Sequence, residues 1–314
     1  MRTDTPAAAT QRSLSRMSLH RPVMLDNALA GLALRPEGPD GVSRPKNGIY
    51  VDGTFGRGGH SAAILAALGP VGHLHALDRD PEAGHHAWRE FAGRSNFSFH
   101  ARNFAEIAAV ANELGIAGCI DGVLLDLGVS SPQFDDAARG FSFANDGPLD
   151  MRMDPSSGES AAAWLARAKE SEIADVLYQF GEERNSRRIA RRIVETRGES
   201  PIATTAQLAA LIATVPGPRS HKIHPATRSF QAIRIFINQE LAALETALAA
   251  MPMLLAPRGR LAVISFHSLE DRIVKRFIRD SELKAVAREF PDDAEVAENP
   301  RARSAVLRIA ERVG

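Results

Sequence analysis

The feature that most constrains the fold is a regular alternation of short apolar runs with amphipathic segments between residues 49 and 127. Strands are predicted at 49–52, 73–77, 96–100 and 122–127. Helices are predicted between them, at 61–68, 81–91 and 105–114. Such an alternation predicts a mostly parallel sheet with helices on both faces. Because crossovers between parallel strands are right-handed, the carboxyl ends of these strands are expected at one edge of the sheet.

The alternation stops near Asp135, and the sequence up to about residue 218 contains only helical patterns. Helices are predicted there at 161–169, 171–180, 182–197 and 205–215, the last with a capping box formed by Thr204 and Gln207. After them come a single long helix from Ala226 to Met251, strands at 259–266 and 304–310, and a helix at 271–280. The prediction is an α/β domain in two pieces, 19–135 and 219–314, with an inserted all-helical domain at 136–218.

Composition excludes several classes of protein. The 314-residue chain is 44% hydrophobic and has no net charge, so a nucleic-acid surface would have to be a local patch. Its single cysteine, Cys119, excludes a disulfide framework and a cysteine-based zinc site, and no metal is expected. No apolar stretch approaches the ~20 residues needed to span a bilayer. Residues 1–18 are expected to form a disordered tail, and a cytoplasmic location is expected.

A glycine-rich turn follows the first predicted strand, with the sequence Asp52-Gly53-Thr54-Phe55-Gly56-Arg57-Gly58-Gly59-His60. Its spacing departs from the pattern of dinucleotide enzymes, and an acid precedes the first glycine. This suits a cofactor that has a charged amino-acid end and no pyrophosphate. Asp78 ends the second strand, where a carboxylate would accept hydrogen bonds from ribose hydroxyls, although a solvated loop is the alternative. Phe104 could pack on adenine or belong to the core.

The fourth predicted strand runs into Asp126-Leu127-Gly128-Val129-Ser130-Ser131-Pro132-Gln133-Phe134. A carboxylate followed by a turn of this kind suits an enzyme that holds an exocyclic amino group for alkylation. Pro132 would stiffen the turn, Ser131 and nearby backbone carbonyls would accept hydrogen bonds from the amine, and Phe134 would stack on the base. Asp126 would hold the cofactor and set the local electric field. A polar turn after a core strand is the alternative interpretation.

Taken together, these segments resemble the RsmH/MraW family, the 16S ribosomal RNA cytosine-N4 methyltransferases that use S-adenosyl-L-methionine. The resemblance covers about residues 19 to 313. Beyond the two segments quoted above it rests on four further blocks: Arg139-Gly140-Phe141-Ser142-Phe143 with the sequence at 147–154, His224-Pro225-Ala226-Thr227-Arg228, Ser265-Phe266-His267-Ser268-Leu269-Glu270, and Asn299-Pro300-Arg301-Ala302-Arg303-Ser304. The tail before residue 19 and the loop at 37–47 are longer than the family needs, and the connection between 279 and 298 is short.

The resemblance implies a class I methyltransferase sheet, Rossmann-like and interrupted after its fourth strand by a helical substrate-recognition domain. The implied cofactor contacts are Gly58, Gly59, His60, Asp78, Phe104, Asp126 and Gln133. The implied substrate is a cytosine in the decoding region of the small ribosomal subunit. The partners are thus 16S ribosomal RNA and that subunit, while a homodimer is compatible with the sequence.

Basic residues outside the glycine turn are the candidates for RNA contact. Arg188 lies with Arg184 and Arg191 on one face of a predicted helix, where they either bind phosphate or pair with nearby glutamates. His224, Arg228 and His267 lie near helix starts, where RNA contact and structural hydrogen bonding are both open.

Three other functions compete with this interpretation. A DNA amino-methyltransferase would share the Ser131-to-Phe134 turn, but a second proline and a tyrosine are missing here. A nicotinamide-dependent oxidoreductase is disfavoured by the glycine spacing. A catalytically silent ribosome-binding protein is disfavoured by the intact glycine turn and its acids.

Overall fold

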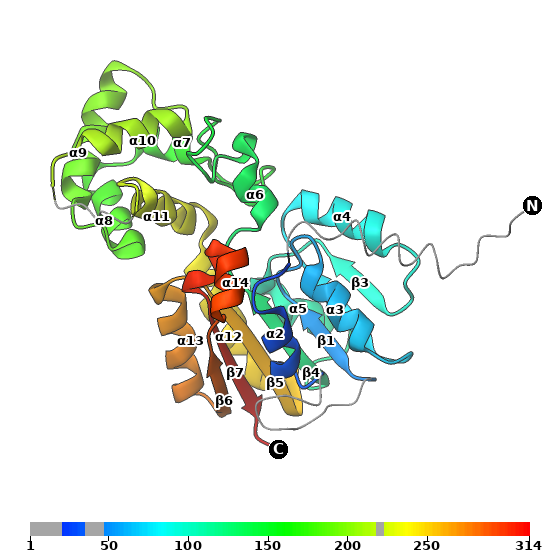
Figure 1. The fold of residues 1–314 in the computed structure, drawn as a ribbon. Coiled ribbons are helices and arrows are strands. Elements are labelled where there is room, and N and C mark those ends of the chain that lie inside the picture. Colours follow the sequence, from blue (N-terminus) through cyan, green and yellow to red (C-terminus); the bar gives the residue numbers. More distant parts are fainter. Residues whose placement is uncertain (1–20, 35–46, 218–222) are drawn as a thin grey trace, which may run out of the picture.

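The centre of the molecule is a seven-stranded sheet with the order β3-β2-β1-β4-β5-β7-β6 (Figure 1). The computed structural model describes residues 21–34, 47–217 and 223–314, so the predicted tail at 1–18 lies outside it. The strands are β1 Ile49–Asp52, β2 His73–Leu77, β3 Phe97–His100, β4 Ile120–Asp126, β5 Leu255–Ser265, β6 Leu283–Glu289 and β7 Val306–Arg312. β7 runs antiparallel to β5 and β6, and the other neighbouring strands pair in parallel. This arrangement confirms the predicted Rossmann-like, mostly parallel sheet of a class I methyltransferase.

Side chains alternate along the central strands and supply an apolar core on each face of the sheet. Tyr50 packs on one face with α2 (Leu25–Gly31), α3 (Gly59–Ala67) and α4 (Pro81–Phe91). Val51 packs on the other face with α5 (Ile107–Glu113), α12 (Glu240–Leu254) and α13 (Ser268–Asp280). A 3₁₀ turn, η1 (Phe104–Glu106), leads into α5. The predicted α/β organisation is therefore confirmed in its layers as well as in its strand order.

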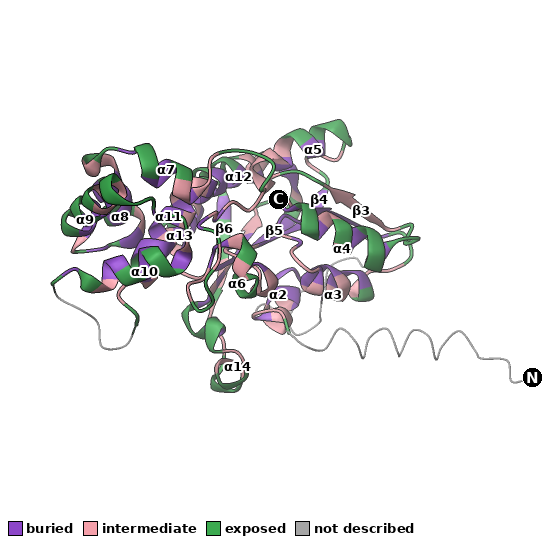
Figure 2. Ribbon diagram, turned by 90° about the horizontal axis from the view of Figure 1, so that it is seen from above, coloured by how far each residue is buried: buried purple, intermediate pink, exposed green. Residues whose placement is uncertain are grey.

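A separate helical layer lies beside the carboxyl edge of the sheet (Figures 1 and 2). Its elements are α6 Ser131–Asp135, α7 Ala161–Arg167, α8 Glu170–Gly181, α9 Ser186–Glu199, α10 Thr205–Thr214 and α11 Thr227–Asn238. They enclose a core of their own, with Trp164, Leu177 and Ile193 at its centre. The predicted capping box of α10 is present, with the Gln207 side chain accepting from the backbone of Thr204 at 3.1 Å.

The prediction of a single long helix from Ala226 to Met251 is wrong. Gln239 adopts φ 52° and separates α11 from α12. The side chain of Asn238 holds this break, because its Nδ2 donates to the carbonyl of Met151 at 2.7 Å and its Oδ1 accepts from the amide of Met153 at 2.8 Å. Since α11 packs into the helical core and α12 packs on the sheet, we propose that the helical unit extends to about residue 238.

Of the elements that were not predicted, α2 and β6 have no local signal. The helix α2 follows Met24, which has φ 51° and no side-chain cap, so no N-cap residue announces it. The strand β6 lies at the edge of the sheet and has a register shift between Ala285 and Ala287, which interrupts its alternation. Within the described ranges, no helix combines the length and apolar character needed to cross a membrane.

Candidate active site

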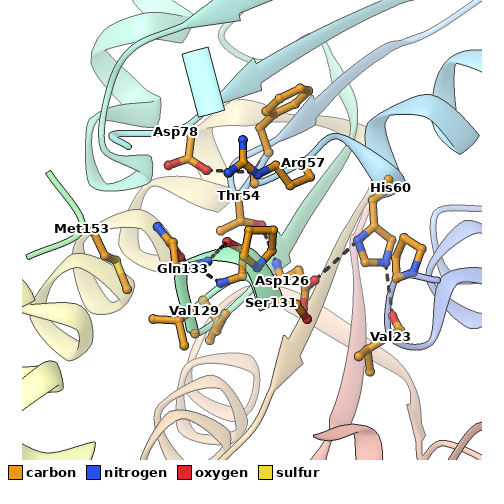
Figure 3. A pocket seen from close by; sticks show the side chains of 18 of the residues that line it. Val23, Thr54, Arg57, His60, Asp78, Asp126, Val129, Ser131, Gln133 and Met153 are labelled. Carbon is orange, nitrogen blue, oxygen red and sulfur yellow. Dashed lines mark hydrogen bonds and ion pairs between the residues drawn. The ribbon is translucent and has the colours of Figure 1, made fainter. Parts of the chain in front are cut away.

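A cavity of about 690 Å³ opens at the carboxyl edge of the sheet, between the ends of β1, β2 and β4 and the helical layer (Figure 3). Eight of the predicted site residues line it: Gly59, His60, Asp78, Phe104, Asp126, Ser131, Pro132 and Gln133. Right-handed crossovers place these residues together, although they come from segments far apart in the chain.

Gly58 does not line the cavity but shapes the turn that does. It is the N-cap of α3 and has φ 72°. A Cβ atom there would come within 2.7 Å of the rings of Phe55 and Phe91, so a side chain would meet both strain and a clash. The turn therefore needs glycine at 58 for backbone geometry, and the next residue, Gly59, reaches the cavity.

Asp78 stands at the end of β2 with its carboxylate at the cavity wall. Its Oδ2 accepts a hydrogen bond from the amide of Gly56 at 2.8 Å, and its Oδ1 accepts from the amide of Asp80 at 2.9 Å. Burial raises the pKa of Asp78, and these two amides oppose the rise. Each carboxylate oxygen keeps acceptor capacity for a ligand hydroxyl.

Asp52 organises the glycine turn from below. Its fully buried carboxyl accepts from the Ser61 hydroxyl at 2.7 Å and from the Thr54 amide at 3.1 Å. Burial raises the pKa of Asp52 to about 6. The Thr54 hydroxyl accepts from the amide of Asp126 at 2.7 Å and so joins the turn to the end of β4.

Asp126 and His60 face each other at the cavity floor, with 3.5 Å between Oδ2 and Nδ1 (Figure 3). Burial lowers the pKa of His60 to about 4, and Nε2 lies 3.2 Å from the carbonyl of Val23, so the neutral ring donates there. Burial, followed by the charges of Asp52 and Glu270, raises the pKa of Asp126 well above its usual range. The pair is therefore not an ion pair. Oδ1 of Asp126 is buried with no hydrogen-bond partner among the described residues.

The predicted amine-binding turn is the short helix α6. Ser130 caps it in a capping box with Gln133, and its carbonyl accepts from the amide of Phe134 at 3.1 Å. The carbonyl of Pro132 accepts from the amide of Asp136 at 3.0 Å. Both carbonyls thus already take part in helix hydrogen bonds, whereas Ser131 lies at the cavity wall.

Phe134 does not line the cavity. Its side chain is 37% exposed, and the guanidinium of Arg301 covers the ring at 4.8 Å from the ring centre. Arg301 also pairs with Asp135 at 2.6 Å. A stacking role for Phe134 on the target base therefore stays a prediction.

The four predicted substrate contacts lie outside the cavity lining and all have protein partners. Arg188 donates to the carbonyl of Pro216 at 3.1 Å, and Arg228 donates to the carbonyl of Glu182 at 3.1 Å. The ring of His224 packs on Phe143 with 4.7 Å between ring centres. His267 caps α13, where its Nδ1 accepts from the amide of Glu270 at 3.4 Å and its Nε2 lies 3.0 Å from the Glu270 carboxylate. Their contact with RNA stays a prediction.

Several cavity residues escaped the prediction from sequence. They come from the start of the described chain, the loop after β2, the helical layer and the C-terminal region: Val23, Arg79, Met153, Glu240, Glu270 and Arg301. Arg79 and Glu270 follow β2 and β5, and Met153, Glu270 and Arg301 lie in segments that carry the family resemblance. None was predicted as a site residue, because only the tertiary structure brings them to the cavity. Among the described residues, no group of three or more potential ligand side chains could hold a metal ion.

Comparison with known proteins assigns this site to a family. The model of the MraW methylase family matches residues 17–313. The chain belongs to the MraW methylase family. It is 58% identical over 316 residues to ribosomal RNA small subunit methyltransferase H of Thioalkalivibrio sulfidiphilus. The aligned region covers 94% of this chain and 97% of that protein. It is 54% identical over 314 residues to the protein of the same name from Xanthomonas campestris pv. campestris strain 8004, covering 94% and 88%.

S-adenosyl-L-methionine, the cofactor of this family of methylases, fits the side chains of the cavity. Its sulfonium and ammonium groups are cationic, and the wall presents the carboxyl groups of Asp78 and Asp126. The unpartnered Oδ1 of Asp126 is a buried polar atom that a ligand would satisfy. The family assignment and the cavity thus agree on a positively charged methyl donor.

Proposed function

We propose that this protein transfers the methyl group of S-adenosyl-L-methionine to the N4 amine of a cytidine in the decoding region of 16S ribosomal RNA. The observation that carries the proposal is a family match over residues 17–313, joined to a carboxyl-lined cavity at the sheet edge. The two relatives named above are ribosomal RNA small subunit methyltransferases. We propose that the enzyme acts in the cytoplasm and that it can form a homodimer. Sedimentation would detect the dimer.

The residues that would hold the donor come from the two strand ends and the glycine turn. Asp78 would accept from the ribose hydroxyls, and Gly59 would let the backbone approach the amino-acid end. The Phe104 side chain, which lines the same cavity, would pack on adenine. When bound, the cofactor supplies an electrophilic methyl group on sulfur. Asp126 would stabilise the adjacent positive charge.

The amine of cytosine is a poor nucleophile because its lone pair is delocalised into the ring. The protein must therefore align the amine with the methyl group and accept its N–H hydrogen bonds. Ser131 lies at the cavity wall, and its hydroxyl oxygen can accept a hydrogen bond from the amine. Since the carbonyls of Ser130 and Pro132 already accept within α6, the proposal assigns the main role to Ser131.

The helical layer would recognise the RNA around the target cytidine. A base that is stacked and paired in a duplex cannot enter an active-site cavity, so the target is unpaired or flipped out of its stack. Arg188 on α9, together with His224 and Arg228 at the start of α11, are the proposed contacts there, and His267 at the start of α13 is the contact from the sheet side.

The decisive experiment is methyl transfer from labelled S-adenosyl-L-methionine to small ribosomal subunits that lack the modification. We expect N4-methylated cytidine when the product nucleoside is identified by mass spectrometry. Transfer to duplex DNA with none to RNA would overturn the proposal in favour of a DNA amino-methyltransferase. Tight cofactor binding without transfer to either substrate would overturn it in favour of a silent ribosome-binding protein.

A further inference from the structure

The loop between α6 and α7 has no role in the reaction described above. It spans residues 139–154 and runs back from the helical layer to the cavity, where Met153 lines the wall (Figure 3). Its path is tightly specified. A Cβ atom on Gly147 would come within 1.9 Å of the carbonyl oxygen of Ala137, and Met151 adopts φ 64°. A loop held in so strained a conformation needs strong anchors.

One anchor is a buried ion pair at the cofactor edge of the sheet. Nη1 of Arg139 donates to Oδ2 of Asp80 at 2.9 Å, with side chains 12% and 4% exposed. The same Oδ2 accepts from Nε2 of Gln133 at 2.5 Å, and Oδ1 accepts from the amide of Glu82 at the start of α4. Asp80 stands two residues beyond Asp78, so the ion pair begins where the cofactor ribose is proposed to bind.

The second amino group of the Arg139 guanidinium binds the loop. Nη2 of Arg139 donates to the carbonyl of Met153 at 2.8 Å and to that of Arg152 at 3.2 Å. The amide of Met153 donates to Oδ1 of Asn238 at 2.8 Å, and Nη2 of Arg79 lies 2.9 Å from its sulfur. Hydrogen bonds from two sides thus set the position of Met153 on the cavity wall.

A buried ion pair is by itself weak evidence for stability, because the cost of desolvating two charges offsets their attraction. Here the Arg139–Asp80 pair joins three segments: Asp80 in the loop after β2 binds Gln133 of α6, and Arg139 binds the carbonyl of the wall residue Met153. These are the segments that hold the cofactor, the amine-binding Ser131 and the entrance to the helical layer. The arrangement therefore suits control of geometry.

We propose that Arg139 is a positioning residue that seats Met153 and α6 against the cofactor cavity, so that the target amine meets the methyl group in line. The inference rests on the proposed function, because it assigns the alignment of that reaction. A misplacement on the order of 1 Å lowers the rate of an aligned reaction by about 100-fold. Loss of the hydrogen bonds between Arg139 and the loop should therefore lower kcat strongly while it changes the Kd for the cofactor little.

The test is Arg139→Lys in the full-length protein. A lysine ammonium can pair with Asp80 as a point charge, but it cannot present a planar fork to the carboxylate and both carbonyls at once. We expect kcat on the small subunit to fall by about 10- to 100-fold, with the Kd for S-adenosyl-L-methionine changed by less than about twofold. Arg167→Lys is the matched control, because Arg167 makes a two-pronged pair with Glu159 on the exposed side of the helical layer. It should change neither quantity.

Met153→Ala tests the same chain of contacts without touching the ion pair, and should lower kcat while leaving the melting temperature and cofactor Kd near the wild-type values. Hydrogen–deuterium exchange at residues 150–154 should become faster in Arg139→Lys. Wild-type kcat in either variant would overturn the proposal, and so would a fall in kcat matched by an equal loss of cofactor binding. If the wild-type enzyme does not methylate the subunit, the proposed function fails. Unchanged exchange at 150–154 would instead overturn the loop-seating role itself.

Discussion

The sheet edge and the helical layer hold their charged side chains in opposite ways. At the sheet edge, Asp52 is buried and Asp126 is half-buried. No described Lys or Arg pairs with either carboxyl, and desolvation raises the pKa of both. In the helical layer, charges lie on the surface in pairs such as Arg191 with Glu170 at 3.7 Å and Arg192 with Glu195 at 3.7 Å. Exposed pairs contribute little energy, whereas buried carboxyls respond strongly to a bound cation. The side chains whose ionisation a bound cation would change therefore lie at the sheet edge.

The largest effect should come from Asp126. We expect Asp126→Ala to lower kcat/KM for methyl transfer by about 1,000-fold, because the cavity would lose the carboxyl that we propose faces the sulfonium. The circular dichroism spectrum should stay unchanged, because the His60 ring that faces Asp126 is neutral and the loss of that carboxyl leaves no unpaired charge behind. Asp175→Ala, on the exposed face of α8, is the control and should have wild-type activity. A well-folded Asp126→Ala enzyme with substantial activity would contradict the assigned role.

The second effect is a pH-dependent affinity that differs between the methyl donor, S-adenosyl-L-methionine, and its product, S-adenosylhomocysteine. Because burial raises the pKa of Asp126 well above its usual range, the carboxyl carries a proton at pH values where a free aspartate does not. A sulfonium favours the carboxylate, so binding releases a proton and affinity rises with pH, by up to about tenfold per unit below that pKa. S-adenosylhomocysteine has no sulfonium charge and should show less dependence. Calorimetry in buffers of different ionisation enthalpy measures the proton; equal release with both ligands would contradict the expectation.

A smaller effect is expected at the α6 turn. Ser131→Ala should lower kcat by about tenfold through the lost acceptor for the amine, with little change in cofactor Kd. Steady-state kinetics on small subunits, together with calorimetric titration of the cofactor, separate the two quantities. Ser142→Ala, in the loop that enters the helical layer, is the control. An equal loss in kcat and cofactor affinity would move Ser131 into the cofactor site.

The smallest effect is expected in the helical layer. Arg188→Ala should weaken binding of the small subunit by about twofold and reduce the slope of affinity against salt concentration, because one phosphate contact among several is lost. Its link to the carbonyl of Pro216 is exposed, so stability should hardly change. Arg192→Ala on the same helix provides the comparison. Identical salt slopes for wild type and Arg188→Ala would remove Arg188 from the RNA surface.

The strands and site residues that could be predicted are those marked by a pattern within a short segment of the chain. Strands β1, β2 and β4 were placed to within two residues because apolar runs bounded by glycine or an acid mark both ends. Asp78, Asp126 and the glycine turn were found because strand ends in a parallel sheet meet at one edge. The break at Gln239 was missed because the apolar stripe continues through it, and the hydrogen bonds that hold it come from Met151 and Met153 in another segment.

The family, the mostly parallel sheet and the acids at its carboxyl edge follow from the amino-acid sequence, because periodicity and strand-end motifs are local properties of the chain. Packing between distant segments sets three further features: His60 faces Asp126 as a neutral ring, Phe134 lies under Arg301 outside the cavity, and Met153 forms a cavity wall. Burial and contacts between distant segments set these features. No short stretch of residues encodes either one.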